Sequence, residues 1–132
     1  MNETTPTYWD YLDLPKLLVA QEGLGDGDVG PDELHFIIVH QAYELWFKLV
    51  LSQIRLARDH LALPEVPEEA VPTVVHHINR VNEIMRLLVD QMKVMETLTP
   101  LDFLDFRDKL VPSSGFQSFQ MRELEILLGL EE

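Results

Sequence analysis

The sequence has no cysteine, few basic residues and no long apolar run. The lack of cysteine excludes disulfide bonds and cysteine ligation of a metal or heme, and it fits a reducing, cytoplasmic location. Only 10 residues are Lys or Arg, against 23 Asp or Glu, and the resulting net charge of −13 disfavours binding to nucleic acid or anionic lipid. No run of about 18 apolar residues occurs, so we expect no membrane-spanning helix.

Signals for β-strands are also nearly absent. We find no useful alternation of apolar and polar residues and no Asn-Gly hairpin. With 132 residues, of which 46% are apolar, the chain is large enough for a single core. The sequence therefore predicts one all-α domain over residues 1–132, built as a helical bundle with two long central helices.

Proline and glycine divide the chain into helical segments. Pro31 suits a first-turn position, where its missing N–H costs nothing, so a long helix is expected from Pro31 to about Leu61. Thr99 is expected to cap a helix that ends before Pro112. The other expected helices are residues 7–20, interrupted at Pro15, the segment after the proline-rich turn 63–72, and a last helix capped by Ser113 or Ser114 and reaching Gly129.

The segment after the proline-rich turn has the clearest helical pattern in the chain. Its apolar residues repeat at alternating intervals of four and three, which is typical of a helix packed along a neighbouring helix. We therefore predict a packing seam on this helix. Its residues are Val74, Ile78, Val81, Met85, Leu88, Met92 and Met95.

A histidine interrupts an aromatic stripe on the first long helix. Phe36 lies one turn before His40 and Tyr43 one turn after it, and Phe47 and Val50 continue the stripe. Such a histidine is either a hydrogen-bonded core residue or a polar group inside an aromatic pocket, able to donate or accept one proton. The pattern leaves both alternatives open.

An arginine interrupts a second aromatic stretch. Arg107 follows Phe103 and Phe106, so its guanidinium extends from an aromatic-rich segment. One interpretation is a surface ion pair with Asp105 or Asp108. The other is a bidentate clamp for the carboxylate of a ligand.

A third feature is the turn Ser113-Ser114-Gly115, which offers hydroxyl and backbone N–H donors near an expected helix N-terminus, where anions are favoured. Taken with Arg107 and the aromatic stripes, it indicates a small aromatic amino acid or acid as ligand.

The remaining polar groupings predict no metal or nucleotide site. His76 and His77 are adjacent, so they point about 100° apart on a helix and are expected at the surface. His40 and Glu44 share a face, but two ligands alone do not form a metal site. The glycine-rich loop 25–30 lacks the preceding strand that a dinucleotide site requires.

Four segments resemble the tryptophan 2,3-dioxygenase family. They are TYWDYLDLPKLLVAQ at 7–21, FIIVHQAYELWFK at 36–48, METLTPLDFLDFRDKL at 95–110 and PSSGFQSFQMRELE at 112–125. These motifs are long and unusual, and they cover nearly the whole chain in order. The resemblance implies a homotetrameric, all-helical heme b enzyme. Such an enzyme inserts both atoms of O2 across the indole C2–C3 bond of L-tryptophan, giving N-formylkynurenine in the kynurenine pathway.

The resemblance also implies roles for individual residues. His40 resembles the distal histidine that hydrogen-bonds the indole N–H, and it is the expected catalytic residue. Phe36 would pack against the indole. Arg107 resembles the arginine that pairs with the substrate carboxylate, and Phe103 would lie beside it where some bacterial members carry tyrosine.

Further residues are assigned by the same resemblance. Ser114 and Gly115 fall where the family lines the heme and substrate pocket, and Met92 falls where an aromatic residue often lies against the heme. The N-terminal residues that would reach into a neighbouring subunit's site are Tyr8, Tyr11 and Leu12.

The family's proximal histidine, which ligates the iron, belongs to a part of the family sequence beyond residue 132. None of the five histidines here matches it, so we expect no iron ligand from this chain and interpret the chain as a fragment. Two alternatives stay open. One is a related heme enzyme that acts on another indole, and the other is a non-catalytic helical assembly module that uses the Val74 to Met95 seam.

Overall fold

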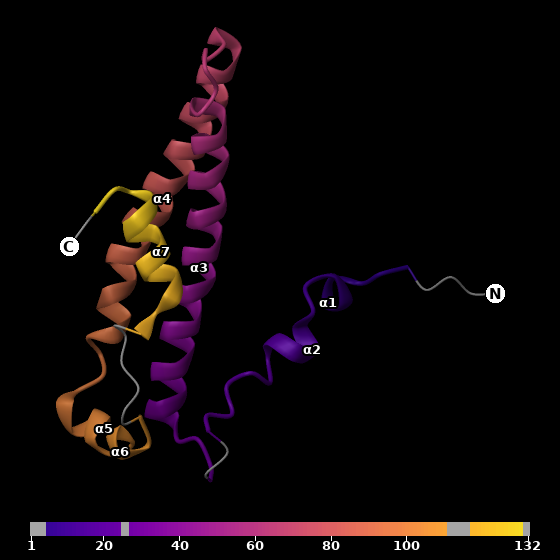
Figure 1. The fold of residues 1–132 in the computed structure, drawn as a ribbon. Coiled ribbons are helices and arrows are strands. Elements are labelled where there is room, and N and C mark those ends of the chain that lie inside the picture. Colours follow the sequence, from indigo (N-terminus) through magenta and orange to yellow (C-terminus); the bar gives the residue numbers. More distant parts are fainter. Residues whose placement is uncertain (1–4, 25–26, 111–116, 131–132) are drawn as a thin grey trace.

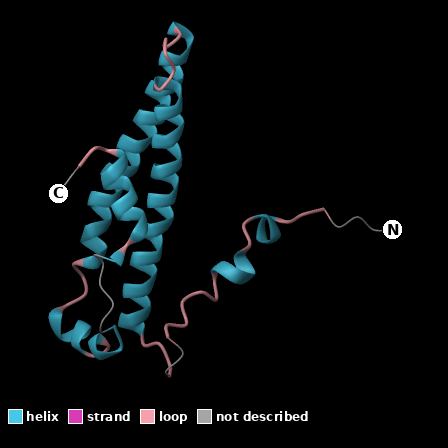
Figure 2. Ribbon diagram, viewed as in Figure 1, coloured by secondary structure: helices cyan, strands magenta, loops and turns pink. Residues whose placement is uncertain are grey.

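A computed structural model describes residues 5–24, 27–110 and 117–130 of the chain. Within these residues all regular structure is helical (Figure 2). Two helices dominate, as the sequence predicts, and the all-α fold with two long central helices is confirmed. The elements are α1 (Tyr8–Tyr11), α2 (Leu14–Leu17), α3 (Pro31–Leu61), the 3₁₀ turn η1 (Glu68–Ala70), α4 (Val71–Met95), α5 (Pro100–Leu104), α6 (Arg107–Leu110) and α7 (Phe119–Leu127).

Helices α3 and α4 form a long antiparallel hairpin (Figure 1). Helix α3 begins at Pro31 and ends at Leu61, the bounds expected from its proline start and acidic first turn. The two helices are linked at the open end of the hairpin, where the ring Nε2 of His35 is 3.0 Å from the carbonyl oxygen of Val94. That end of the hairpin carries α5 and α6, and η1 lies at the closed end (Figure 1).

The packing face of α4 differs from the predicted seam. Ile84 and Leu88 are its buried residues, whereas Ile78, Met85 and Met92 of the predicted seam are exposed. Two sets of residues with a helical repeat start at Val74 on this helix. In the predicted seam the intervals between residues are four, then three. In the set that faces α3 they are three, then four. The residues of that inner face are Val74, His77, Val81, Ile84, Leu88, Gln91 and Met95.

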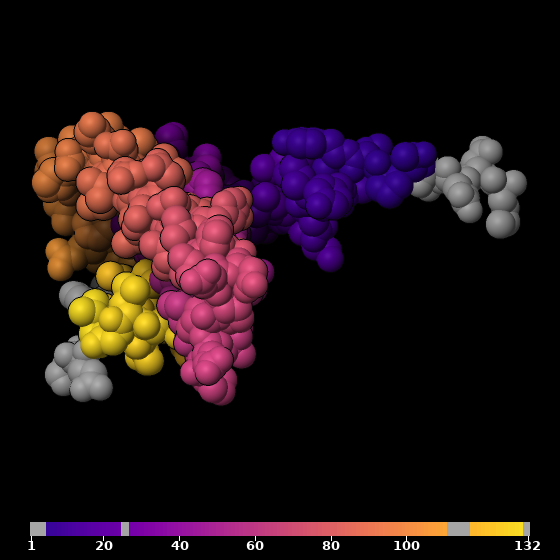
Figure 3. Space-filling view, turned by 90° about the horizontal axis from the view of Figure 1, so that it is seen from above, coloured from indigo at the N-terminus to yellow at the C-terminus, as the bar shows by residue number. Residues whose placement is uncertain are grey.

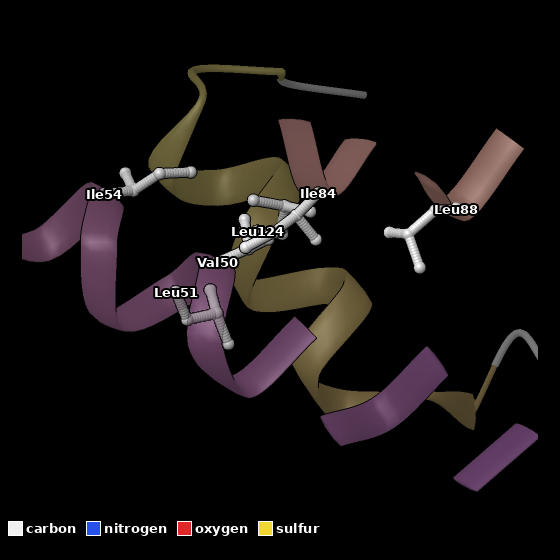
Figure 4. Close-up of a cluster of buried hydrophobic side chains, with 6 residues drawn as sticks. All are labelled: Val50, Leu51, Ile54, Ile84, Leu88 and Leu124. Atoms are coloured by element: carbon white, nitrogen blue, oxygen red, sulfur yellow. The ribbon is translucent and has the colours of Figure 1, made fainter. Parts of the chain in front are cut away.

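The core lies between α3, α4 and α7. Three residues of α3 meet two of α4 and one of α7, and in Figure 4 their side chains point toward one another. Tyr43 extends this core, because its hydroxyl donates to the carbonyl oxygen of Leu88 at 2.6 Å and burial raises its pKa. The six core residues are Val50, Leu51, Ile54, Ile84, Leu88 and Leu124.

Helix α7 is fixed to α3 through Glu44. The Glu44 carboxylate accepts a hydrogen bond from the Ser118 hydroxyl at 2.6 Å and one from the Gln120 amide at 2.8 Å. Ser118 also caps α7, since its hydroxyl accepts from the backbone N–H of Met121. The expected cap at Ser113 or Ser114 is therefore wrong, because the helix begins only at Phe119.

In two places the structure has a pair of short helices where the sequence predicted one longer helix. The expected helix over 7–20 is two single turns, broken at Asp13, whose backbone has a φ of 54°. Pro15 lies in the first turn of α2 and does not interrupt it, because a proline is tolerated there. The helix expected from Thr99 to before Pro112 is likewise divided, into α5 and α6.

The segment that carries α1 and α2 projects from the hairpin as an arm, defined here as residues 5–21. Figures 1 and 3 both show it extending away from the helical body. Hydrogen bonds to Gln41 hold its base: the Gln21 amide donates to the Gln41 side chain at 3.0 Å, and the Gln41 amide donates to the Ala20 carbonyl at 2.8 Å. No helix among the described residues is long and apolar enough to cross a membrane.

Candidate functional site

An aromatic cluster forms where the beginning of α3 meets α5 and the residue before α6. The Phe36 ring centroid lies 4.1 Å from that of His40, 5.8 Å from that of Phe103 and 5.4 Å from that of Phe106. Phe103 and Phe106 are themselves 5.4 Å apart in an edge-to-face arrangement. The structure thus brings together Phe36, His40 and Phe103, which were predicted from separate parts of the sequence.

The position of His40 fixes which of its ring nitrogens carries a proton. Its Nδ1 lies 2.8 Å from the backbone carbonyl oxygen of Phe36. A carbonyl can only accept a hydrogen bond, so Nδ1 must be the donor. In the neutral ring the other nitrogen, Nε2, then keeps its lone pair and can accept a hydrogen bond. Since the His40 side chain is exposed, this acceptor is open to a ligand.

Helix α5 places Phe103 through a well-defined start. The Thr99 hydroxyl accepts from the backbone N–H of Asp102, and the Asp102 carboxylate accepts from the backbone N–H of Thr99 at 3.0 Å. Hydrogen bonding of the Asp102 carboxylate to the Thr99 side chain, and then to the Thr99 backbone N–H, lowers the pKa of Asp102. One turn later the helix breaks, and Phe106 enters the cluster as its buried member. Phe106 is the site residue that the sequence prediction missed, although its place beside Phe103 and Arg107 was visible.

Arg107 begins α6 directly after the buried Phe106. Its side chain is exposed, and within residues 5–24, 27–110 and 117–130 it has no hydrogen bond or ion pair. The surface ion pair with Asp105 or Asp108, one of the two interpretations of this arginine, is therefore not formed. The guanidinium remains available for a carboxylate, and the residue before it, Phe106, belongs to the aromatic cluster.

Other predicted site residues lie elsewhere. Tyr8, Tyr11 and Leu12 are on the arm and exposed, away from the cluster of their own chain. Met92 lies on the exposed face of α4. Ser114 and Gly115 lie outside the described residues.

The prediction that both His76 and His77 lie at the surface is wrong for His77. His76 is exposed as expected, but His77 is partly buried on the inner face of α4. Its Nδ1 lies 2.7 Å from the side-chain oxygen of Gln53, a buried residue of α3. Adjacent residues on a helix point in different directions, and only one of the two faces α3. Among the described residues, no three His, Asp or Glu side chains are grouped so that they could hold a metal ion.

The fold and the cluster define an all-α protein that presents an imidazole acceptor beside three phenylalanine rings, with an unpaired arginine directly after one of them in the sequence. The family model described as Tryptophan 2,3-dioxygenase matches residues 1–132. The chain therefore belongs to the tryptophan 2,3-dioxygenase family, and the resemblance seen in its motifs is confirmed.

Curated relatives agree with this family. The chain is 47% identical over 127 residues to a tryptophan 2,3-dioxygenase of Sorangium cellulosum and 49% identical over 129 residues to tryptophan 2,3-dioxygenase 2 of Ralstonia nicotianae. A tryptophan 2,3-dioxygenase of Alteromonas mediterranea is 48% identical over 126 residues. These matches cover 95%, 96% and 94% of this chain but 31%, 35% and 35% of the relatives. The chain thus spans about a third of their length.

The family implies heme, and among the described residues the polar group of the aromatic cluster that bears on such a site is His40. His40 is the histidine of the aromatic cluster, and its free Nε2 suits a ligand that donates a proton. His35 and His77 each use a ring nitrogen on the neighbouring helix. Met92, expected at the heme, is exposed on α4. The aromatic cluster of this chain therefore suits the binding of an aromatic ligand.

Proposed function

We propose that this chain forms the substrate-binding part of a tryptophan 2,3-dioxygenase, which uses O2 to open the indole C2–C3 bond of L-tryptophan and yields N-formylkynurenine. The observation that carries the proposal is the aromatic cluster in which His40 offers a free Nε2 acceptor. The unpaired Arg107 directly follows Phe106 of this cluster. Relatives named for this activity align with nearly the whole chain.

Each part of L-tryptophan has a matching group in this proposal. The indole ring packs against Phe36 and Phe103, whose faces and edges suit another aromatic ring. Nε2 of His40 accepts the hydrogen bond of the indole N–H. The Arg107 guanidinium pairs with the carboxylate through two parallel N–H donors. Three contacts of different chemistry fix the orientation of the ring, which is the contribution the protein makes to such a reaction.

Heme b is the cofactor that the proposal requires, and when bound it supplies the activation of O2. Met92, Ser114 and Gly115 remain the proposed heme-lining residues, and Ser114 and Gly115 also line the substrate site. The proximal histidine is proposed to come from outside residues 1–132. The residues of the aromatic cluster bind and orient the indole and exclude water from it.

A homotetramer is the proposed assembly, in the cytoplasm. The exposed arm supports association of copies, because Tyr8 and Tyr11 are 76% and 83% exposed and α1 buries no residue. A projecting aromatic segment of this kind is suited to packing on another molecule. In the proposed tetramer Tyr8, Tyr11 and Leu12 enter the site of a neighbouring subunit.

The test is turnover by the full-length, heme-loaded protein in which residues 1–132 have this sequence. We expect L-tryptophan to give N-formylkynurenine, and tryptamine, which lacks the carboxylate, to be a far poorer substrate. The substitution Arg107→Met should remove most of that preference, because it weakens the binding of L-tryptophan and leaves that of tryptamine unchanged. Equal turnover of tryptamine and L-tryptophan by the unmodified protein would instead support a related enzyme for another indole.

The remaining alternative is a helical assembly module without heme chemistry. It predicts a colourless protein that develops no Soret band when hemin is added to the full-length form, with or without L-tryptophan. A saturable Soret band that shifts with L-tryptophan would exclude the module.

A further inference from the structure

An ion pair with a buried carboxylate joins α6 to the first turn of α3. The Lys109 ammonium lies 3.2 Å from Oε2 of Glu33. The Glu33 side chain is only 7% exposed, and that of Lys109 is 38% exposed. Glu33 is the third residue of α3, where the helix dipole favours a negative charge. Among the ion pairs of the described residues this one contains the most buried partner.

The other oxygen of the same carboxylate faces the turn between the arm and α3. Gly23 has a φ of +68°, and a Cβ built there would lie 3.5 Å from Oε1 of Glu33 and 3.3 Å from Cγ2 of Val29. The backbone at Gly23 thus passes close over the carboxylate. Glu33 therefore lies at a junction of three segments, the base of the arm, the start of α3 and α6.

The ion pair joins the two helices that carry His40 and Arg107. Glu33 lies about two turns before His40, so both are on the same side of α3. Lys109 lies two residues after Arg107 in the same four-residue helix. Helix α6 buries none of its own residues and is too short to be stable alone. Its place relative to α3 therefore depends on the preceding Phe106 and on Lys109.

The two anchors act differently. Phe106 is held by packing against other aromatic rings, and such apolar contacts tolerate small shifts of the ring. An ion pair with one buried partner requires a narrow geometry, because displacement of Lys109 leaves the buried charge of Glu33 uncompensated. An ion pair of this kind adds little to stability compared with an apolar pair, so fixing a distance is the effect that distinguishes it.

We propose that Glu33 and Lys109 are positioning residues that set the distance between Arg107 and His40, and that they thereby determine selectivity for indoles bearing a carboxylate. This inference rests on the proposed function, because it assigns the carboxylate to Arg107 and the indole N–H to His40. Neither Glu33 nor Lys109 contacts the substrate in it.

The test uses Lys109→Met in the full-length, heme-loaded protein with L-tryptophan as substrate. We expect KM to rise about ten- to a hundredfold, since a misplaced clamp loses a bidentate contact, while kcat changes little. The inhibition constant of tryptamine should stay unchanged, whereas that of indole-3-propionate, which keeps the carboxylate, should rise with KM. Lys109→Arg should restore both the KM for L-tryptophan and the inhibition constant of indole-3-propionate. Lys93→Met, which removes an exposed lysine paired with Asp90, is the matched control and should behave as the unmodified protein.

A double variant separates positioning from stability. Lys109→Met alone leaves a buried carboxylate without a partner and should lower Tm, whereas Glu33→Gln with Lys109→Met removes both charges and should recover Tm. Positioning predicts that KM stays raised in the double variant. Recovery of KM together with Tm, or a rise of the tryptamine inhibition constant in parallel with KM, would overturn the proposal.

The same experiments separate this inference from the proposed function. If the unmodified protein does not oxidise L-tryptophan, the proposed function fails, and the inference fails with it. If the unmodified protein is active and Arg107→Met raises KM, but Lys109→Met has the kinetics of Lys93→Met, only the inference about Glu33 and Lys109 is wrong.

Discussion

His40 shows how a single backbone contact decides what a side chain can do. Its Nδ1 is held by the carbonyl of Phe36 in the same helix, which leaves Nε2 as an acceptor beside the aromatic cluster. A histidine with the opposite tautomer would present a donor there and would repel an indole N–H. The helix itself therefore sets the polarity of the site.

Replacing His40→Ala should raise the KM for L-tryptophan of the full-length, heme-loaded protein. Loss of a hydrogen bond to a buried donor costs about 1–3 kcal/mol, or roughly five- to 150-fold in KM. 1-Methyl-L-tryptophan has no indole N–H, so its binding should change far less in the same variant. The exposed His76→Ala serves as control. An equal loss for both substrates would contradict the role of Nε2.

His77 illustrates a second effect of position at the residue scale. Burial lowers its pKa below the ordinary value of 6.5, and His76, His60 and Arg80 lower it further by charge repulsion. Its bond to Gln53 and the stacking of His60 on its ring place these groups at the interface of α3 and α4. Protonation of His77 therefore works against packing of the two helices.

Stability of the folded chain should consequently depend on pH. Between the lowered pKa and 6.5 the unfolded chain binds more protons, so the free energy of unfolding rises with pH in this window. The contribution is complete above about pH 6.5 and is lost as pH falls through the folded-state pKa. Urea unfolding between pH 5 and 8 should show this slope in the unmodified protein. His77→Phe should make it shallower, more than His76→Gln does, because burial is the larger cause. Equal slopes in all three proteins would rule out His77 as the source.

At the scale of elements, α4 has two apolar stripes with similar spacing, and only one packs on α3. Leu88 belongs to both patterns and is 6% exposed, while Met85 belongs only to the predicted seam and is 39% exposed. Ile84, which the predicted seam omits, is buried instead. The stripe that includes Ile78, Met85 and Met92 is left on the outside of this chain.

Two truncations compare these stripes directly. Leu88→Ala removes a core side chain and should lower the free energy of unfolding by about 2–5 kcal/mol. Met85→Ala should change it by no more than about 0.5 kcal/mol, as is usual for surface positions. Urea denaturation of the two variants measures both values. A larger loss for Met85→Ala than for Leu88→Ala would mean that the predicted seam was the packing face after all.

At the scale of the whole molecule, the arm and the hairpin are nearly independent. The arm is tethered at its base by Gln21 and Gln41 and extends from the body in both views (Figures 1 and 3). Helices as short as α1 and α2 are not stable without packing, and the rest of their own chain does not supply it. An exposed aromatic arm is consistent with the proposed contact with another copy.

Removal of residues 1–19 from the full-length protein should therefore affect assembly more than folding. We expect Tm to remain unchanged, because no core residue lies in the arm, and analytical ultracentrifugation to show a species smaller than the proposed tetramer. The substitution Val19→Ser, which changes the arm near its base without removing its aromatic residues, is the control. An unchanged sedimentation coefficient after the deletion would show that the arm is not needed for assembly.

Much of the fold could be predicted from sequence because its signals are local. The bounds of α3 follow from a proline at the first turn, and the start of α5 follows from the capping pair of Thr99 and Asp102. The breaks at Asp13 and before Arg107 were missed, since a left-handed residue and a divided helix depend on packing and leave no strong pattern. The cap of α7 was missed for a related reason, because Glu44 selects Ser118 from a distant helix.

The sequence by itself determined the helical class, the two long helices and the identity of His40 and Arg107 as the polar groups among aromatic residues. Those features depend on residue type and spacing along one helix. Only the tertiary structure decided which stripe of α4 faces α3, that Phe106 joins Phe36, and that Glu33 holds Lys109. These contacts join residues up to 76 positions apart, and no local preference specifies which of several apolar faces or charges will meet.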